Sequence, residues 1–450
     1  MASTYLPPGV YITETTNPAQ GGLPAGFRTI GLVATGSNTL PVSNTPVVKG
    51  TANGTDVIPV STFTLVSVTA IGTVPNLAQF ILGTDFTVSG NSITWLSSGQ
   101  QPTTGSTYYV SWNRQKLAPE YLPQTFGNNM ASIRNTYGFE LNNGVYTPIT
   151  VAANLMFGNG APQIIISQAL TSAVTDIQTA VDAMKAVQVD LLVVPQSCNT
   201  TLTQYVRNHT LTMSAPGAQH ERVFISSSDG FSDATTTIVA KANLNSVDRF
   251  WMVAPPAFDM ILQDAVTKSN QTVFLPGQYL AAAVAGAVAN PANDAATPLT
   301  RQTIVGPSDL STFNYLDSDK NYLSQNGVMV LEFANGGGLQ IRDGVTTDST
   351  NVNTVTPSVR LIKDYILKTL RPLLDRTYIG TKITSQTPSQ IATTIQTYLT
   401  GLIANTLITK IGTITVVQDS VDPRTIDVTL SFMPIYPLEI INVTFSLLLN

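Results

Sequence analysis

Residues 151–347 alternate between short apolar runs and longer amphipathic stretches, and this alternation leaves few possible folds. The short runs predict buried strands at 163–167, 190–194, 222–225 and 250–254. Helices are predicted after Leu170, where apolar residues recur at helical spacing, near 232–244 and at 278–289. A strand, helix, strand succession builds a mixed or parallel sheet with helices on both faces. We therefore expect a central α/β domain formed by residues 28–35 and 119–350.

A separate all-β segment interrupts this domain near its start. Residues 36–118 hold short strand candidates at 62–70, 86–88, 92–96 and 107–112, divided by turns rich in glycine and proline. This spacing predicts a small β-sandwich or barrel of its own, inserted into the central domain. Residues 118–144 are aromatic, rich in asparagine and irregular, and we expect them to return the chain to the central domain.

Two amphipathic helices are predicted in residues 351–450, which we expect to form a C-terminal α+β domain. The first covers 360–371, with one broad apolar side and one charged side. The apolar side consists of Leu361, Ile362, Tyr365, Ile366 and Leu370. The charged side consists of Arg360, Lys363, Lys368 and Arg371, with Asp364 among them. The second helix begins at Thr387, where Thr-Pro-Ser-Gln is typical of a helix start, and has Ile391, Ile395, Tyr398, Leu399 and Leu402 on its apolar face.

Strands end the chain, and one strand candidate opens it. Residues 412–418 and 425–432 predict a hairpin around the turn Val421-Asp-Pro-Arg, and residues 438–450 predict a terminal strand. Near the start, Val10 to Thr15 is a strand candidate with no neighbour in reach for a hairpin. Because an isolated strand is unstable in water, we expect this segment to join a sheet formed elsewhere, in its own chain or in a neighbouring one.

The two ends of the chain resemble a known family. The N-terminal Pro-Gly-Val-Tyr-Ile-Thr-Glu (8–14) and the closing segment 431–450 are similar to the sheath proteins of contractile phage tails. The resemblance implies a structural subunit that forms six-membered rings stacked helically around an inner tube, and that contracts to drive this tube through a cell envelope. It also implies baseplate and tail terminator proteins as partners, assembly in the host cytoplasm and a place in the virion.

The same resemblance assigns candidate contact residues. Terminal arms of one subunit would add strands to the C-terminal sheet of its neighbours. The predicted exchange residues are Val10, Tyr11, Ile12, Thr13, Glu14, Ile441, Val443, Phe445 and Leu447. The C-terminal domain of such proteins lies innermost, so the one concentrated basic helix face here is expected to contact the tube. Its residues are Arg360, Lys363, Lys368 and Arg371.

Composition excludes several other classes of function. Charged residues make up 11% of the chain and acidic residues outnumber basic ones 27 to 22, so we expect no contact with nucleic acid. Few surface charges suit a subunit that packs against its own copies. With one cysteine and two histidines, neither a disulfide framework nor a cysteine- or histidine-based metal centre is expected, and we predict no cofactor. We expect no signal peptide, and we see no apolar run long enough to span a membrane.

Four features invite a chemical interpretation, and for each the structural alternative is stronger. Cys198 follows a predicted strand but lacks the glycine spacing of a nucleophile elbow. His209 lies on the apolar stripe of a predicted helix. Residues 336–338 are three glycines without a dinucleotide-binding pattern, and we predict a tight turn there. Asp317 with Asp319 lacks the rest of a calcium loop. We therefore predict no enzyme, and keep as alternatives a hydrolase-like enzyme and a surface adhesion protein that acts through its β-domain.

Overall fold

The computed structural model describes residues 29–60, 63–197, 199–294, 296–310, 313, 315–334, 336–439 and 441. Its centre is a nine-stranded sheet in the order β17-β20-β19-β14-β13-β12-β1-β11-β8. The six parallel strands are β1 (Ile30–Thr35), β11 (Gln163–Ala169), β12 (Leu191–Val193), β13 (Val223–Ser227), β14 (Phe250–Ala254) and β19 (Val328–Phe333). Antiparallel strands extend both edges: β8 (Gln124–Gly127), β20 (Leu339–Ile341) and β17 (Thr303–Ile304).

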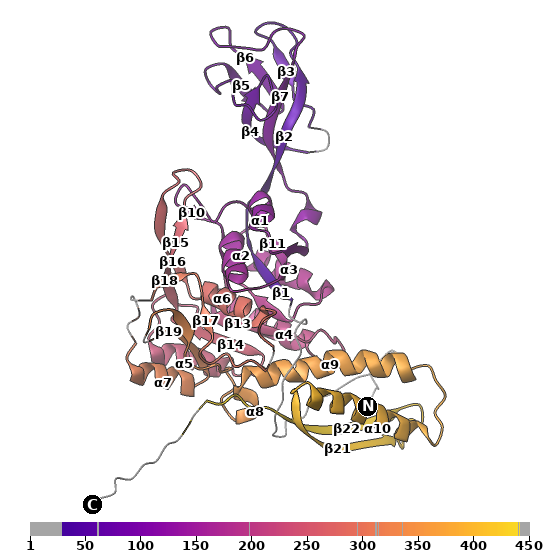
Figure 1. Cartoon of the computed structure of the whole chain (residues 1–450). Coiled ribbons are helices and arrows are strands. Elements are labelled where there is room, and N and C mark those ends of the chain that lie inside the picture. Colours follow the sequence, from indigo (N-terminus) through magenta and orange to yellow (C-terminus); the bar gives the residue numbers. More distant parts are fainter. Residues whose placement is uncertain are drawn as a thin grey trace, which may run out of the picture.

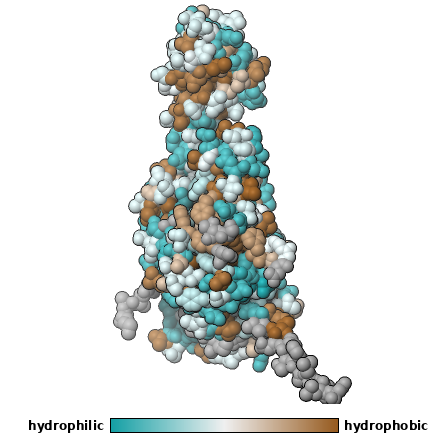
Figure 2. Space-filling model, turned by 90° about the vertical axis from the view of Figure 1, so that its left-hand side faces the viewer, coloured by the Kyte–Doolittle hydropathy of each residue, from teal (hydrophilic) through white to brown (hydrophobic). Residues whose placement is uncertain are grey.

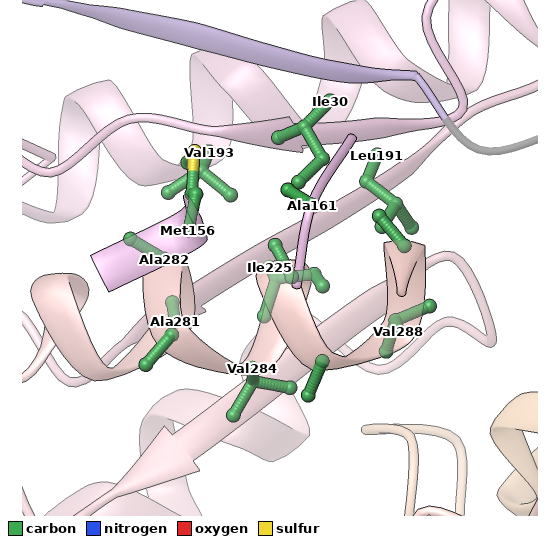
Figure 3. Packing of buried hydrophobic residues seen from close by; sticks show 14 of the residues in the cluster. Ile30, Met156, Ala161, Leu191, Val193, Ile225, Ala281, Ala282, Val284 and Val288 are labelled. Atoms are coloured by element: carbon green, nitrogen blue, oxygen red, sulfur yellow. The ribbon is translucent and has the colours of Figure 1, made fainter. Parts of the chain in front are cut away.

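Helices cover both faces of this sheet, as the sequence predicted. On one face lie α2 (Pro148–Gly158) and α6 (Gln278–Ala289). Figure 3 shows Ala281, Ala282 and Val284 of α6 among the buried hydrophobic residues of this core. On the other face lie α3 (Val174–Ala183), α4 (Thr200–Met213), α5 (Thr235–Leu244) and α7 (Asp317–Gln325). Successive strand residues alternate between the two cores: Leu191 and Val193 face α6, whereas Leu192 faces the opposite helices. The mixed α/β class is therefore confirmed.

The stretch after the inserted segment is more regular than we predicted. Within residues 118–144 the structure has a short 3-10 helix (Ala118–Tyr121), strand β8 and helix α1 (Met130–Tyr137). The side chain of Asn129 caps α1 by accepting a hydrogen bond from the Ser132 amide at 3.2 Å. The expectation of an irregular return path was wrong, because β8 is ordered by pairing with β11. In this pairing Gly127 lies opposite Gln163, which is 36 residues later in the chain.

A second small sheet was not predicted. Strands β15 (Ala257–Gln263) and β16 (Asn270–Pro276) form a hairpin that β18 (Pro307–Asp309) extends, and it stands beside the central domain (Figure 1). The short hairpin β9 (Leu141–Asn142) and β10 (Val145–Tyr146) lies at its tip. The carboxylate of Asp264 joins the two hairpins by accepting hydrogen bonds from the amides of Gly144, Val266 and Thr267 at 2.8–2.9 Å. These bonds hold the pKa of Asp264 at about 2.

The inserted β-segment stands apart at one end of the molecule (Figure 1). It consists of two three-stranded sheets, β2-β7-β4 and β3-β6-β5, around a hydrophobic cluster of its own that includes Trp95 and Trp112. The strands are β2 (Thr39–Val48), β3 (Thr55–Val57), β4 (Leu65–Gly72), β5 (Phe86–Ser89), β6 (Ser92–Trp95) and β7 (Thr107–Gln115). Figure 2 shows apolar side chains gathered on its surface, and Ile81 is 63% exposed. The chain enters this segment at β2 and leaves it at β7.

The C-terminal part contains the two predicted helices and the predicted hairpin. A short helix α8 (Val352–Val355) leads into α9 (Pro357–Tyr378), and α10 (Thr387–Ala404) returns beneath it (Figure 1). The apolar faces of α9 and α10 meet, with Ile366, Leu370, Ile395 and Leu399 all buried. Strands β21 (Ile408–Gln418) and β22 (Ile426–Pro434) form the hairpin.

Tyr398 offers a modest test of the contact between these helices. Its hydroxyl is hydrogen-bonded to Thr369 Oγ1 on α9. Replacing Tyr398 by phenylalanine removes the bond and keeps the ring, so we expect the free energy of unfolding to fall by about 1 kcal/mol. Chemical denaturation of both proteins measures the difference. A fall of more than about 3 kcal/mol would show that the hydroxyl does more than make this bond.

Candidate assembly interface

The hairpin β21–β22 is a two-stranded sheet with both outer edges open. Within the described part of the chain, neither strand pairs with anything except the other. Helix α10 packs against β21, yet the inward apolar side chains remain only partly buried. These are Ile411, Ile414, Val416, Ile426, Leu430 and Phe432. Two strands with a half-covered apolar face are marginal alone, so this hairpin has the backbone groups and the apolar surface to accept further strands.

The turn of the hairpin explains why the strands take this register. Asp419 Oδ1 accepts hydrogen bonds from the amides of Val421 and Asp422, both at 2.6 Å, and these bonds lower the pKa of Asp419. Across the turn, the Asp419 amide donates to the carbonyl oxygen of Thr425 at 3.0 Å. Aspartate that binds backbone amides two and three residues ahead is a common turn former. The turn predicted at Val421-Asp-Pro-Arg is confirmed.

Most of the predicted exchange residues lie outside the described residues. These are Val10, Tyr11, Ile12, Thr13, Glu14, Val443, Phe445 and Leu447. Of the set, only Ile441 is described, and it is 72% exposed in a segment without secondary structure. Just before it, the hydroxyl of Tyr436 is hydrogen-bonded to Asn353 of α8. Strand exchange by both arms therefore stays a prediction.

The charged side of α9 is a buried contact within the chain, and our expectation of an exposed basic face was wrong. Arg360 is 2% exposed and Arg371 is 8% exposed. Arg371 pairs with Glu221 and Lys368 pairs with Asp190. Lys363 is partly buried on the same helix. In this conformation the arginines are inaccessible to a partner, and whether any of the four residues contacts a tube stays a prediction.

The acidic partners of α9 lie where three inner strands of the central sheet begin. Asp190 immediately precedes β12, Glu221 lies two residues before β13, and Asp248 lies two residues before β14. Because these strands are parallel and adjacent, their amino-terminal ends lie side by side. Three carboxylates from distant parts of the sequence therefore form a row at this end of the sheet. Helix α9 crosses this end (Figure 1), so its charged side faces the carboxylates and its apolar side faces α10.

Asp364 is the centre of this ion-pair network. Arg249 contacts its carboxylate through both terminal nitrogens at 2.7 Å, and Arg360 adds a third bond at 2.7 Å. Arg360 also reaches Asp248 at 3.0 Å. Burial alone would raise the pKa of Asp364, but the charges of Arg249 and Arg360 outweigh burial and hold the pKa at about 2. The pair of arginines on one carboxylate joins the C-terminal helices firmly to the central domain.

His209 is a packing residue of α4. It is 6% exposed, and its Nε2 lies 3.1 Å from Arg222 Nη1, whose guanidinium also donates to the carbonyl oxygens of Met184 and Val187. Burial first, and then the charge of Arg222, lower the pKa of His209 to about 4. No nucleophile is placed against it by the described residues, and Cys198 lies outside them.

This lowered pKa predicts a pH dependence of stability. Between pH 6.5 and about 4, His209 is protonated in the unfolded chain and neutral in the folded chain. The free energy of unfolding should therefore fall as the pH drops through this range. His209→Gln should remove that part of the slope and cost on the order of 1 kcal/mol at pH 7. Urea unfolding of both proteins at pH 7, 5.5 and 4.5 measures it. An unchanged slope in the variant would contradict the assignment.

The remaining candidates have structural roles. Asp317 and Asp319 begin α7; Asp319 accepts from the Leu316 amide at 3.1 Å and Asp317 lies 3.3 Å from Arg342. Among 336–338, Gly337 and Gly338 have positive φ in the turn between β19 and β20, which confirms the predicted tight turn. Within the residues that the structure describes, no helix is long and apolar enough to cross a membrane.

These features define a class of protein before any comparison. The conspicuous feature of the described residues is a C-terminal hairpin with open edges and a partly buried apolar face. That combination is typical of a structural subunit that associates through its strands. Comparisons with known proteins agree with this class.

Residues 171–347 match the family model of the phage tail sheath protein central domain. A tail sheath protein of Mycobacterium phage Bxz1 is 26% identical over 401 residues, which cover 83% of this chain and 67% of that protein. The chain is therefore similar to contractile tail sheath proteins over most of its length.

Solved structures show the same fold at low sequence identity. The helical sheath of the anti-feeding prophage in its contracted state is 14% identical, with a TM-score of 0.61 over 99% of both chains. The contracted PVC sheath complex of an extracellular contractile injection system is 12% identical, with a TM-score of 0.54 over 99% of this chain and 98% of that one. Both likenesses concern the fold of the whole chain, the inserted β-segment included.

Sequence reasoning missed the function of the α9 charges. We predicted that Arg360, Lys368 and Arg371 form an exposed face of the helix. Helical periodicity separates the apolar side from the charged side, but it does not show which side faces solvent. One signal was available. Asp190 begins one predicted strand, and Glu221 and Asp248 lie just before the next two. Parallel strands bring these starting positions to the same end of a sheet.

Proposed function

We propose that this protein is the structural subunit of a contractile sheath, which polymerises as stacked hexameric rings around an inner tube and contracts to drive that tube through a cell envelope. The open two-stranded hairpin β21–β22 carries the proposal. It supplies backbone groups and apolar surface that strands from other subunits can cover. The similarity to tail sheath proteins and the fold shared with helical sheaths support the same reading.

Strand addition gives such a polymer its continuity. Segment 10–14 of one subunit and segment 441–447 of another would pair with the two outer edges of the hairpin in a neighbour. Main-chain hydrogen bonds provide affinity, and the alternate side chains would cover Ile414, Leu430 and Phe432. Such pairing would persist while subunits tilt and move outward, so the polymer would stay linked during contraction.

Contraction requires stored interface energy and no bound nucleotide. Assembly on a tube and baseplate would hold each copy in a packing that is not the lowest in free energy. Release then changes the relative positions of subunits. The low charge of the chain suits this role, since extensive neutral surfaces can pack in two arrangements without large electrostatic penalties. Tube, baseplate and tail terminator proteins would be its partners, in a virion assembled in the host cytoplasm.

Electron microscopy of the purified, negatively stained protein tests this function. We expect tubes with a wide hollow core, because sheath subunits released from a tube should assemble in the contracted arrangement. Dispersed particles at all concentrations would contradict the proposal. A hydrolase activity that is lost in Cys198→Ala would favour an enzyme instead, and soluble protein that binds cell surfaces through residues 36–118 would favour an adhesion protein.

A further inference from the structure

The inserted β-segment leaves the central sheet at a position where α/β proteins usually bind ligands. The parallel strands follow the order β11-β1-β12-β13-β14-β19, so the winding of the sheet reverses at β1. Helix α2, which precedes β11, covers one face, and α4, which follows β12, covers the other. In such sheets a crevice opens beyond the carboxyl ends of the strands at the reversal. Here the chain departs from that end of β1 into the inserted segment.

Side chains of the central domain fill this position and bind the departing chain. Gln196, just after β12, accepts a hydrogen bond from the Thr35 amide at 2.7 Å. Gln168 of β11 is 3% exposed, and its Nε2 is within hydrogen-bond distance of the carbonyl oxygens of Gly36 at 3.0 Å and Ser37 at 3.1 Å. It also lies 2.9 Å from Oδ1 of Asn38. One glutamine side chain thus contacts three consecutive residues, 36–38, between β1 and β2.

The returning strand binds the same glutamine. Lys116 is 4% exposed, and its Nζ donates to Gln168 Oε1 at 2.6 Å while lying 4.4 Å from the ring centre of Tyr137. Its amide donates to the carbonyl oxygen of Asn38 at 2.9 Å, which joins the two connections directly. Burial lowers the pKa of Lys116 to about 8. Burying a charged lysine costs free energy unless it is hydrogen-bonded, so the bond to Gln168 and the ring of Tyr137 are needed to hold Lys116 in this position.

Contacts at the rim extend this anchorage. Asn38 Nδ2 donates to the carbonyl oxygen of Leu170 at 3.0 Å, on the central domain. Arg114 of β7 pairs through two hydrogen bonds with Glu120, which lies in the short helix that follows the inserted segment. The ladder between β2 and β7 continues down to the pair Thr39 and Gln115, so no unpaired linker separates the inserted segment from the central domain.

We propose that these groups, the neck socket of Asn38, Lys116, Tyr137, Gln168 and Gln196, fix the inserted β-segment to the central domain as one rigid body. A segment joined by two chain crossings would otherwise be free to reorient. The socket replaces the ligand crevice of this sheet with an anchor. Every copy therefore presents its β-segment at the same angle, and the β-segment follows each movement of its central domain. The inference holds whether or not the protein forms a sheath.

Distance measurements between two spin labels in the full-length protein test the proposal. The exposed residues Thr87, on the inserted segment, and Thr175, on α3, are replaced by cysteine in a Cys198→Ala background. We expect a single narrow distance distribution in this otherwise native protein. Gln168→Leu combined with Lys116→Met should at least double its width, whereas Gln163→Leu, an exposed glutamine of the same strand, should leave it unchanged.

Two results would overturn the proposal. A broad distance distribution in the otherwise native protein would show that the inserted segment moves relative to the central domain. This result can be interpreted without any variant of the socket. A narrow distribution in the double variant, with far-ultraviolet circular dichroism like that of the parent, shows that the socket does not set the orientation. If the double variant fails to fold, Lys116→Met alone removes one hydrogen bond and keeps the alkyl packing. An unchanged width in that single variant would likewise count against the socket.

Discussion

Replacing Asp364 by asparagine should lower the free energy of unfolding by about 3–5 kcal/mol, because Arg249 and Arg360 would remain buried without a carboxylate between them. Loss of one partner of a buried ion pair costs more than the pair contributes, since the remaining charges lose their compensation. We expect helix α9 to separate from the central domain first. Denaturant unfolding gives the free energy, and amide hydrogen exchange of α9 shows where protection is lost.

An exposed ion pair on the same part of the chain is the control. Asp422 pairs with Arg424, whose side chain is 87% exposed, and because water screens this pair, Asp422→Asn should leave the free energy of unfolding close to that of the parent. A loss of under about 1 kcal/mol in Asp364→Asn would contradict a stabilising network. The pH dependence gives a second readout. The pKa of Asp364 is about 2 when folded and 3.8 in its ordinary state, so its contribution is present above pH 4 and should vanish as the pH falls towards 2. Asp364→Asn should lack this part of the acid sensitivity.

Deleting residues 1–20 should abolish polymerisation and leave a folded subunit. The deletion removes Val10 to Glu14, the segment proposed to cover an open edge of the hairpin in a neighbouring copy, and leaves the described core intact. Circular dichroism and thermal unfolding should match those of the full chain. Electron microscopy and sedimentation should show small particles where the full chain gives tubes.

A shorter deletion makes the comparison specific. Removing residues 1–6 takes away the chain before the strand candidate and should leave tube formation unchanged. Tubes of normal length and order from the 1–20 deletion would exclude strand exchange by this arm as the link between subunits. A truncated protein that no longer folds would show that the arm completes a sheet within its own chain instead.

Regular elements with strong periodicity could be predicted from the sequence, some to the residue. Strand β14 and helix α6 have the predicted bounds, because a β-strand of five apolar residues and an alanine-rich helix of twelve are specified locally. The helices on both faces followed from the alternation of strands and helices. Elements ordered by distant partners were missed: β8 depends on β11, and β18 depends on β15. Their short sequences have no periodicity of their own.

The sequence by itself determined that α9 has one apolar and one charged side, and that α10 and the hairpin follow it. Only the tertiary structure decided which sides meet which partners. Asp190, Glu221 and Asp248 are far apart in the chain and reach α9 because parallel strands align their amino-terminal ends. In the same way, Gln168 and Lys116 meet because the inserted segment leaves and re-enters at one end of β1. Periodicity reports on contacts a few residues apart, whereas burial of a charge depends on carboxylates that lie more than a hundred residues away.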